Sequence, residues 1–580
     1  MILLPLLSLP LAFTPPITDL SPRKVPSTQH DDPTVTLTNC EYPITLTGKY
    51  DGSFNQDLYL GVPYAQPPIG SKRFRTPEPY VYTEDLQVTE HAPACLQVPN
   101  TTADGIYGMS EDLVVYIHGG SFIEGTASIY NASWLVARSQ EIDKPVITVV
   151  ANFRLGVIGF GYGSGFAENN AANLALRDNI AALRWVGEHI EAFGGDPQKV
   201  TVLGGSLGAV AISLLYLNPE FDLFRSAIMS SGAQNSPPMG PTDSTWEDSY
   251  QRLLEITNCT LPDHAETAFE CLRCLPAEVL LEAQFALQAD PRWSTSFIFG
   301  TLLLSMLGQS DYADRNDSTS APSIDGDLIP KSPFELLEEG RFAKIPFIAG
   351  NVKDEGTYFT SPQVNSSSLF AVLNAIEPVD PAEMLLEKLV KVYTDNPALG
   401  SPFDTANETF GLDPRFKQSA AIFGDVAFQG PRRHFLRSAS RYGLEDIWTY
   451  QFEQISPDRP AYLGVSHATD VPYFFGRARP GVGDPHYLQF NYTEEDHELS
   501  NAIMDYWINF IYYTDPNSPS GKPLPEWPRY DSSDSGRNML KLKYGDIGVI
   551  TDDYREENMD VIYRNYRQFN YKRDVNVDLL

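Results

Sequence analysis

Three short apolar runs, each ended by glycine or polar residues, constrain the fold of this chain most. They cover residues 113–117, 145–150 and 199–203, and residues 226–229 and 345–349 are further candidates for the same pattern. A strand with one solvated face alternates apolar and polar residues, whereas these runs are apolar nearly throughout. They are typical of strands that are buried on both faces of a parallel sheet.

A helical pattern lies between the second and third runs. In residues 179–190 the apolar positions recur at the spacing of one helix face. The order strand, helix, strand predicts a doubly wound α/β sheet, because parallel strands are joined by crossovers that cover the sheet. Ligands of such sheets bind beyond the carboxyl ends of the strands. We therefore expect the functional site at the turns that end these runs.

The strongest local signal for chemistry is GGSLG at residues 204–208, directly after the third run. It matches G-x-S-x-G and precedes a helical apolar pattern at residues 209–215. Strand, sharp turn and helix form a nucleophile elbow, and the amino terminus of the helix favours negative charge on the reacting oxygen. Ser206 is therefore the candidate nucleophile. The alternative is an ordinary glycine turn, because the motif alone also occurs by chance.

A serine nucleophile also needs donors for an oxyanion, and the turn after the first run can supply them. Residues 118–122 read HGGSF, which resembles the HGGG loop of esterases. We expect the backbone amides of Gly120, Ser121 and Leu207 to stabilise the developing charge without reorganising. Taken alone, this glycine pair would more often be a plain turn.

Matches to one family extend over nearly the whole chain. The matching motifs are LGVPYAQPPIG (60–70), FGGDP (193–197), GNVKDEGTYF (350–359), GVSHATDVPYFFG (464–476), DPN (515–517) and WP (527–528). In this order they resemble the type-B carboxylesterases, which include cholinesterases and several fungal lipases, and they are most similar to secreted fungal-type esterases. The resemblance implies an α/β-hydrolase fold: a large, mostly parallel sheet flanked by helices, in a single domain over residues 15–580.

The same resemblance implies that Glu355 and His467 complete a triad with Ser206. His467 would take the serine proton and later protonate the leaving alcohol. Glu355 would fix the imidazole tautomer and stabilise the imidazolium, and Asp354 is the alternative acid. The implied reaction is hydrolysis of a small-molecule or lipid ester through an acyl-enzyme. It requires neither a metal nor an organic cofactor.

The sequence also suggests two residues near the triad and one disulfide. By the resemblance, Ser231 and Asp470 match positions that hydrogen-bond near the triad, although either could simply satisfy loop backbone. The chain has five cysteines, an odd number that leaves at least one thiol without an intramolecular partner. Cys259 and Cys271 are candidates for a short disulfide.

Some residues depart from the family pattern. Gly205 stands where the family usually has glutamate, and Leu207 where it usually has alanine. We therefore expect the pocket floor to lose a negative charge and the acyl pocket to be narrower. Residues 96–110 contain no tryptophan, the residue that holds a quaternary ammonium by a cation–π contact in cholinesterases. Both features argue against a choline ester. The same loop is short, which argues against a long lipase-type lid.

A family segment is missing between Asp112 and Leu113. In the family a strand and a loop of about 20 residues lie there, and they carry the cysteine that would pair with Cys95. We expect the loss to expose backbone donors and acceptors beside residues 146–150. Our hypothesis is a faulty gene model or a lost exon; the alternative is a natural deletion.

Charge and the amino terminus indicate where the protein acts. The formal net charge is −33, which disfavours binding to nucleic acid or to anionic membranes. Residues 2–13 are apolar, long enough for a signal peptide over residues 1–14 and too short to cross a bilayer, and no transmembrane segment follows. Seven glycosylation sequons support secretion weakly: Asn100, Asn131, Asn258, Asn316, Asn365, Asn407 and Asn491. We expect a secreted protein.

Two other functions stay open beside a general esterase. Within enzymes, the alternative is a lipase or a sterol esterase. From another class, the chain could be a cholinesterase-like binding domain or an inactive truncated isoform. The complete set of Ser206, Glu355 and His467 speaks against the binding domain.

Overall fold

The computed structural model describes residues 31–97, 105–107, 112–236, 244–260, 265–288, 321–364, 388–482, 491–517, 524–533 and 535–565. The predicted signal peptide at residues 1–14 lies outside these ranges. Within them, no helix combines the length and the apolar character needed to cross a membrane.

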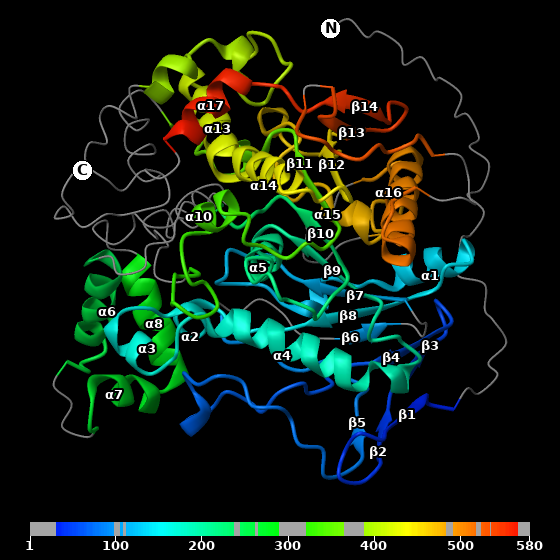
Figure 1. Cartoon of the computed structure of the whole chain (residues 1–580), viewed down its shortest axis with the longest axis vertical. Helices are drawn as coiled ribbons and strands as arrows, with labels where there is room; N and C mark the ends of the chain where they lie inside the picture. The colour runs from blue at the N-terminus through cyan, green and yellow to red at the C-terminus, as the bar shows by residue number, and fades with distance from the viewer. Residues whose placement is uncertain are drawn as a thin grey trace, which may run out of the picture.

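An 11-stranded sheet forms the centre of the described part of the chain (Figure 1). Its strands, in spatial order, are β14 (Gly548–Thr551), β13 (Asn538–Leu542), β12 (Ile447–Phe452), β11 (Phe347–Val352), β10 (Ser226–Ser230), β9 (Val200–Gly205), β7 (Asp112–Ile117), β8 (Val146–Ala151), β6 (Gly105–Tyr107), β4 (Gln56–Tyr59) and β3 (Lys49–Asp51). Neighbouring strands are parallel from β8 through to β13 and antiparallel towards both edges. A separate 3-stranded sheet contains β1 (Thr34–Leu37), β2 (Ile44–Thr47) and β5 (Leu86–Gln87).

The predicted apolar runs are the central strands β7 to β11, and both of their faces are covered. In β7, Val115 and Ile117 pack into one hydrophobic cluster, whereas Val114 and Tyr116 pack into another on the opposite face. All residues of β7 and β9 are buried. This burial on both sides explains why the runs are apolar throughout rather than alternating.

Helices cover the two faces of the sheet. One face is covered by α4 (Leu174–His189), α5 (Leu207–Leu215) and α14 (Gly430–Arg441), and the other by α1 (Ser133–Glu141), α15 (Val471–Phe474) and α16 (Glu494–Tyr513). Figure 1 shows α4 lying across the sheet and α16 beside α1 at one side. The helix predicted at residues 179–190 is the larger part of α4. The α/β-hydrolase architecture predicted from the sequence is confirmed.

A smaller hydrophobic cluster lies beside the sheet. It joins α3 (Ser164–Glu168), α6 (Ser244–Ile256), α7 (Ala268–Cys274) and α8 (Ala277–Gln288), which gather at one corner of Figure 1. Cys259 and Cys271 form a disulfide inside this cluster. The remaining helices are α2 (Gly156–Phe160), α10 (Pro333–Glu338), α13 (Pro414–Gly424), a π-helical turn (Asp425–Gln429) and α17 (Glu556–Arg564).

One expectation about the sheet is wrong. The prediction that a family segment is missing between Asp112 and Leu113 includes exposed backbone groups beside residues 146–150. Instead, β6 pairs antiparallel with residues 148–150 of β8 and, on its other side, with β4. β7 runs unbroken through Asp112 and Leu113. The backbone groups of β8 are therefore paired, because the short segment that forms β6, earlier in the chain than β7, adds a strand to the sheet at this position.

Candidate active site

Ser206 lies in the sharp turn between β9 and α5. Its backbone is in the positive-φ region, at φ 55° and ψ −127°, and its amide donates to the Ser230 carbonyl at 2.8 Å. A Cβ atom on Gly208 would come within 2.0 Å of the Ile117 carbonyl oxygen, and one on Gly204 within 2.6 Å of the Gly208 carbonyl carbon. The turn therefore requires both glycines, and it leaves the serine hydroxyl partly exposed at the end of the strand.

The side chains of Ser206, His467 and Glu355 form one hydrogen-bonded line. His467 Nε2 lies 2.9 Å from Ser206 Oγ, and His467 Nδ1 lies 2.5 Å from Glu355 Oε2. The imidazole and the carboxylate are almost fully buried. This geometry allows the imidazole to accept the serine proton at one nitrogen while the carboxylate orients the other.

Two loops bring these side chains together. Asp354 and Ser466 form an isolated parallel bridge, so the loop that carries Glu355 runs beside the loop that carries His467. The far oxygen of Glu355 accepts from the Val352 amide at 3.0 Å and from Asn351 Nδ2 at 3.1 Å. Glu355 is therefore fixed on both of its oxygens.

Asp354, the alternative acid, has a different role in this geometry. Its carboxylate accepts from the amides of Val465 at 2.9 Å and Phe403 at 2.8 Å, and from Ser401 Oγ at 3.0 Å. Burial raises the pKa of Asp354 to about 6, and these donors oppose that rise. The side chain ties the loops to each other, and Glu355 is the carboxylate that reaches the imidazole.

Aromatic rings lie against the imidazole of His467. The ring centroid of Phe428 lies 4.7 Å from that of His467, and the ring of Phe359 lies 4.9 Å from it. Phe428 belongs to the π-helical turn, and sequence reasoning missed it. Phe359 closes the motif at residues 350–359, which is the one signal that could have pointed to it.

The predicted oxyanion donors lie on two sides of the nucleophile. Gly120 has φ 108°, and a Cβ there would meet the Glu124 carbonyl oxygen at 2.0 Å. Ser121 has φ 55°, which is unusual for a residue other than glycine. Among the described residues, no hydrogen bond joins the amides of Gly120, Ser121 or Leu207 to another protein group. Gly120 and Ser121 line the pocket that contains Ser206, whereas Leu207 is buried and is not among its lining residues.

Asp470 lies beside the proposed triad and accepts hydrogen bonds from two hydroxyl groups. Asp470 Oδ2 accepts from Ser230 Oγ at 2.6 Å and from the Tyr450 hydroxyl at 3.2 Å. Ser231, the predicted residue, lines the same pocket, and its Oγ is 3.5 Å from that of Ser230. Burial and the charge of Glu355 raise the pKa of Asp470 to about 6, and the hydrogen bond from Ser230 opposes that rise.

These residues surround a pocket of about 140 Å³ as bounded by the described chain. Its lining residues are Tyr116, Gly119, Gly120, Ser121, Glu124, Tyr130, Gly205, Ser206, Ser230, Ser231, Tyr358, Phe359, Arg459, His467, Ala468, Asp470 and Val471. In the part of the chain that the structure describes, no group of three or more His, Cys, Asp or Glu residues is placed to hold a metal ion.

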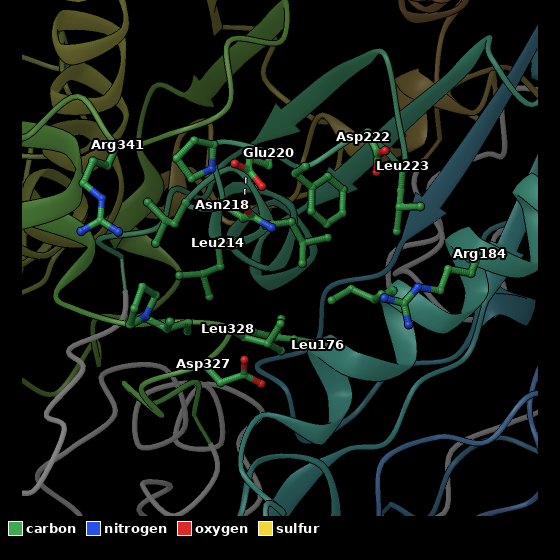
Figure 2. Close-up of a pocket in the computed structure, with 17 residues that line it drawn as sticks. Leu176, Arg184, Leu214, Asn218, Glu220, Asp222, Leu223, Asp327, Leu328 and Arg341 are labelled. Atoms are coloured by element: carbon green, nitrogen blue, oxygen red, sulfur yellow. Dashed lines mark hydrogen bonds between the residues drawn. The ribbon is translucent and has the colours of Figure 1, made fainter.

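A larger hollow of about 410 Å³ lies between α4 and two loops, residues 218–223 and 327–330 (Figure 2). Figure 2 shows Arg184 and Arg341 at opposite ends of it, with leucine side chains between them. Its lining includes neither Ser206 nor His467. Volume alone would point here, but the groups suited to nucleophilic chemistry line the smaller pocket.

Comparison with known proteins settles the family. A family model described as the carboxylesterase family matches residues 32–562. The chain belongs to the carboxylesterase family. The predicted family is confirmed, and this carboxylesterase is a carboxylic ester hydrolase.

Individual relatives agree with this assignment. The carboxylesterase is 29% identical to Lipase 2 of Geotrichum candidum over 591 residues, with 92% of this chain and 94% of the relative covered. It is 29% identical to Secreted lipase 1 of Botryotinia fuckeliana over 568 residues, with 88% and 90% covered. Among solved structures, EstA of Aspergillus niger matches with a TM-score of 0.75 at 23% identity, covering 93% of this chain and 99% of EstA. This last likeness supports the fold.

Proposed function

We propose that this carboxylesterase hydrolyses its ester through Ser206, with His467 as the base and Glu355 as the acid that orients it. The observation that carries the proposal is the unbroken line of contacts, 2.9 Å from Ser206 Oγ to His467 Nε2 and 2.5 Å from His467 Nδ1 to Glu355 Oε2. A serine hydroxyl is a weak nucleophile until a base removes its proton. The hydroxyl of Ser206 has a base beside it, and that base has a carboxylate beside its other nitrogen.

The reaction has two halves. Ser206 Oγ bonds to the ester carbonyl carbon while its proton passes to His467 Nε2, and the carbonyl oxygen becomes an oxyanion. The amides of Gly120, Ser121 and Leu207 stabilise that charge, because they are already in place and need no reorganisation. His467 then gives the proton to the alcohol oxygen as the bond from carbon to that oxygen breaks. Water, activated by the same imidazole, releases the acid from the acyl-enzyme.

The size of the pocket favours small esters. A volume of about 140 Å³ is below the roughly 300–1,000 Å³ of sites that enclose drug-sized ligands. The relatives named as lipases keep a lipid ester as the second candidate. Comparing hydrolysis of p-nitrophenyl acetate with that of a triglyceride monolayer separates the two, and faster turnover at the monolayer would favour the lipase.

We also propose that the protein is secreted. The apolar stretch at residues 2–13 has the length of a signal peptide, and one relative is named as a secreted lipase. The Cys259–Cys271 disulfide is typical of an oxidising compartment. Sequencing the amino terminus of protein recovered from culture medium tests this, and an intact Met1 in a purely cellular protein would contradict it.

Covalent labelling tests the catalytic proposal. A fluorophosphonate probe should modify Ser206, identified by peptide mass spectrometry, and abolish hydrolysis of p-nitrophenyl acetate. Ser206→Ala should take up no label at this site and lower kcat by about 10⁴-fold or more. Folded protein, verified by circular dichroism, that neither reacts with the probe nor hydrolyses the ester would overturn the proposal in favour of a binding domain. Failure to fold at all would favour an inactive truncated isoform.

A further inference from the structure

Arg459 places a positive charge in the wall of the catalytic pocket. Its side chain lines the pocket together with Ser206, Tyr358 and His467. Its Nη1 donates to the hydroxyl of Ser466, the residue directly before the catalytic histidine. Arg459 lies outside the motif at residues 464–476, so no family motif points to it.

The surroundings of Arg459 are partly buried and rich in hydroxyl groups. The phenols of Tyr358 and Tyr492 lie close enough to act on its charge, and burial lowers its pKa. A guanidinium nevertheless stays protonated throughout the working range of an enzyme. The pocket therefore carries a permanent cation that can donate hydrogen bonds in a fork suited to a carboxylate.

Two acidic side chains, Glu124 and Asp470, line the same pocket, and burial raises the pKa of each. Glu124 follows the oxyanion loop, and its raised pKa favours the neutral carboxyl. Tyr358 is influenced by both charged groups: burial raises its pKa to about 12, with Arg459 lowering it and Glu124 raising it. The positive charge of Arg459 is thus more persistent than the negative charge of either carboxyl.

The position of Arg459 relative to Ser206 and His467 bears on which portion of the ester it would contact. His467 Nε2 must protonate the leaving oxygen, so the alcohol portion lies on the imidazole side of Ser206. The oxyanion is directed away from there, towards the amides of Gly120 and Ser121. Arg459 donates to Ser466, the residue before His467, so its anchoring contact is to the loop that carries the imidazole.

We propose that Arg459 binds a carboxylate on the alcohol portion of the substrate, so that the preferred substrates are esters of alcohols or phenols that bear an acidic group. This inference rests on the proposed function, in which Ser206 and His467 perform the hydrolysis. Arg459 is then a specificity residue: it contacts the substrate away from the bond that breaks.

A matched pair of substrates tests the proposal. 4-Acetoxybenzoate and 4-acetoxybenzamide have nearly the same shape and differ in charge, and both release a phenol that can be followed by absorbance. Arg459→Met should lower kcat/KM for the benzoate relative to the benzamide by about 10- to 100-fold, the size expected for losing a charged hydrogen-bond partner. Arg459→Lys should retain part of the preference, because it keeps the charge and loses the fork.

Controls separate binding from a structural role. Arg184→Met, which alters an exposed arginine of the other hollow, should leave the ratio of the two substrates unchanged. If Arg459 only supported the Ser466–His467 loop, both substrates would lose activity equally in Arg459→Met, and the proposal would be overturned. If that variant does not fold, inhibition of the wild type decides: 4-hydroxybenzoate should inhibit hydrolysis of the benzamide ester more strongly than 4-hydroxybenzamide does, and equal inhibition overturns the proposal. Loss of all esterase activity in the wild type would instead count against the proposed function.

Discussion

Glu355 is oriented by a chain of buried polar groups behind it. Asn351 Nδ2 donates to Glu355 Oε1, and Asn351 Oδ1 accepts from Arg432 Nε at 2.7 Å. Arg432 also donates to Asp552 at 2.8 Å, and both of those side chains are buried. Because Arg432 can only donate, it fixes which end of the Asn351 amide faces the carboxylate. Asn351 and Arg432 are thus positioning residues for the proposed acid.

Replacing Asn351 by leucine tests this chain. Asn351→Leu removes one donor from Glu355 without a large change in volume, so the carboxylate should hold the imidazole less firmly. We expect kcat to fall about tenfold with KM nearly unchanged, as for loss of one hydrogen bond to a charged group. Thr449→Val is the matched control, since Thr449 accepts from Arg432 but does not touch Glu355. Equal losses of kcat in the two variants would contradict the assignment.

Asp470 gives the stability of the protein a pH dependence of known sign. Burial raises its pKa to about 6 in the folded protein, against about 3.9 for an unperturbed aspartate. The folded state therefore binds the proton more tightly than the unfolded state. The stabilising contribution is complete below about pH 4, and it is lost as the pH rises through about 6.

Comparison with Asp470→Asn isolates this contribution from other titrating groups. The wild type should lose up to about 3 kcal/mol in free energy of unfolding relative to the variant between pH 4 and pH 7, since one pKa unit corresponds to 1.36 kcal/mol. Urea denaturation of both proteins at several pH values measures the difference. A difference that stays constant over this range, or that grows in favour of the wild type at high pH, would contradict the assignment.

Among the secondary-structure elements, the π-helical turn between α13 and α14 places two residues at the site. It directs Phe428 against the ring of His467, and Gln429 Nε2 donates to the Val352 carbonyl at 2.8 Å. Val352 ends β11 just before the loop that carries Glu355. A π turn changes the angular position of the residues after it, so the same helical segment can reach both loops.

The disulfide restrains two neighbouring helical segments that lie away from the pocket around Ser206. Cys259 and Cys271 are 12 residues apart and join the segment after α6 to α7, in a cluster that shares no residue with the pocket lining. The double variant Cys259→Ser/Cys271→Ser should lower stability by about 2–4 kcal/mol, because the unfolded chain regains the entropy of an open loop. Thermal unfolding measures the loss, and esterase activity at 25 °C should be retained. Activity that disappears while the fold persists would show that this cluster supports the site directly.

At the scale of the whole molecule, the sheet brings distant parts of the sequence to one edge. Along the chain, His467 lies 261 residues from Ser206 and 112 residues from Glu355. The three side chains nevertheless meet, because Ser206 follows β9, Glu355 follows β11 and His467 lies in the loop after β12. The single domain over residues 15–580 and the signal peptide stay predictions. The net charge of −33 is spread over the chain, whereas the pocket around Ser206 contains a half-buried arginine, so the global charge does not describe the local site.

The sequence by itself determined the strands, the elbow and the family. Burial on both faces of the sheet requires continuous apolar residues in a strand. The sharp turn leaves no room for side chains and requires Gly204 and Gly208. Short stretches of sequence are therefore enough to predict both features. The motifs at residues 350–359 and 464–476 then named Glu355 and His467 through the family resemblance.

Only the tertiary structure decided which neighbouring groups face the site. It separated Glu355 from Asp354, gave Asp470 the hydroxyl of Ser230 as its close partner, and brought Phe428 and Arg459 to the pocket. It also paired β6 with β8, where we expected open backbone. These outcomes depend on contacts between segments far apart in the chain and on differences of an ångström or less, and no local pattern of residues encodes such distances.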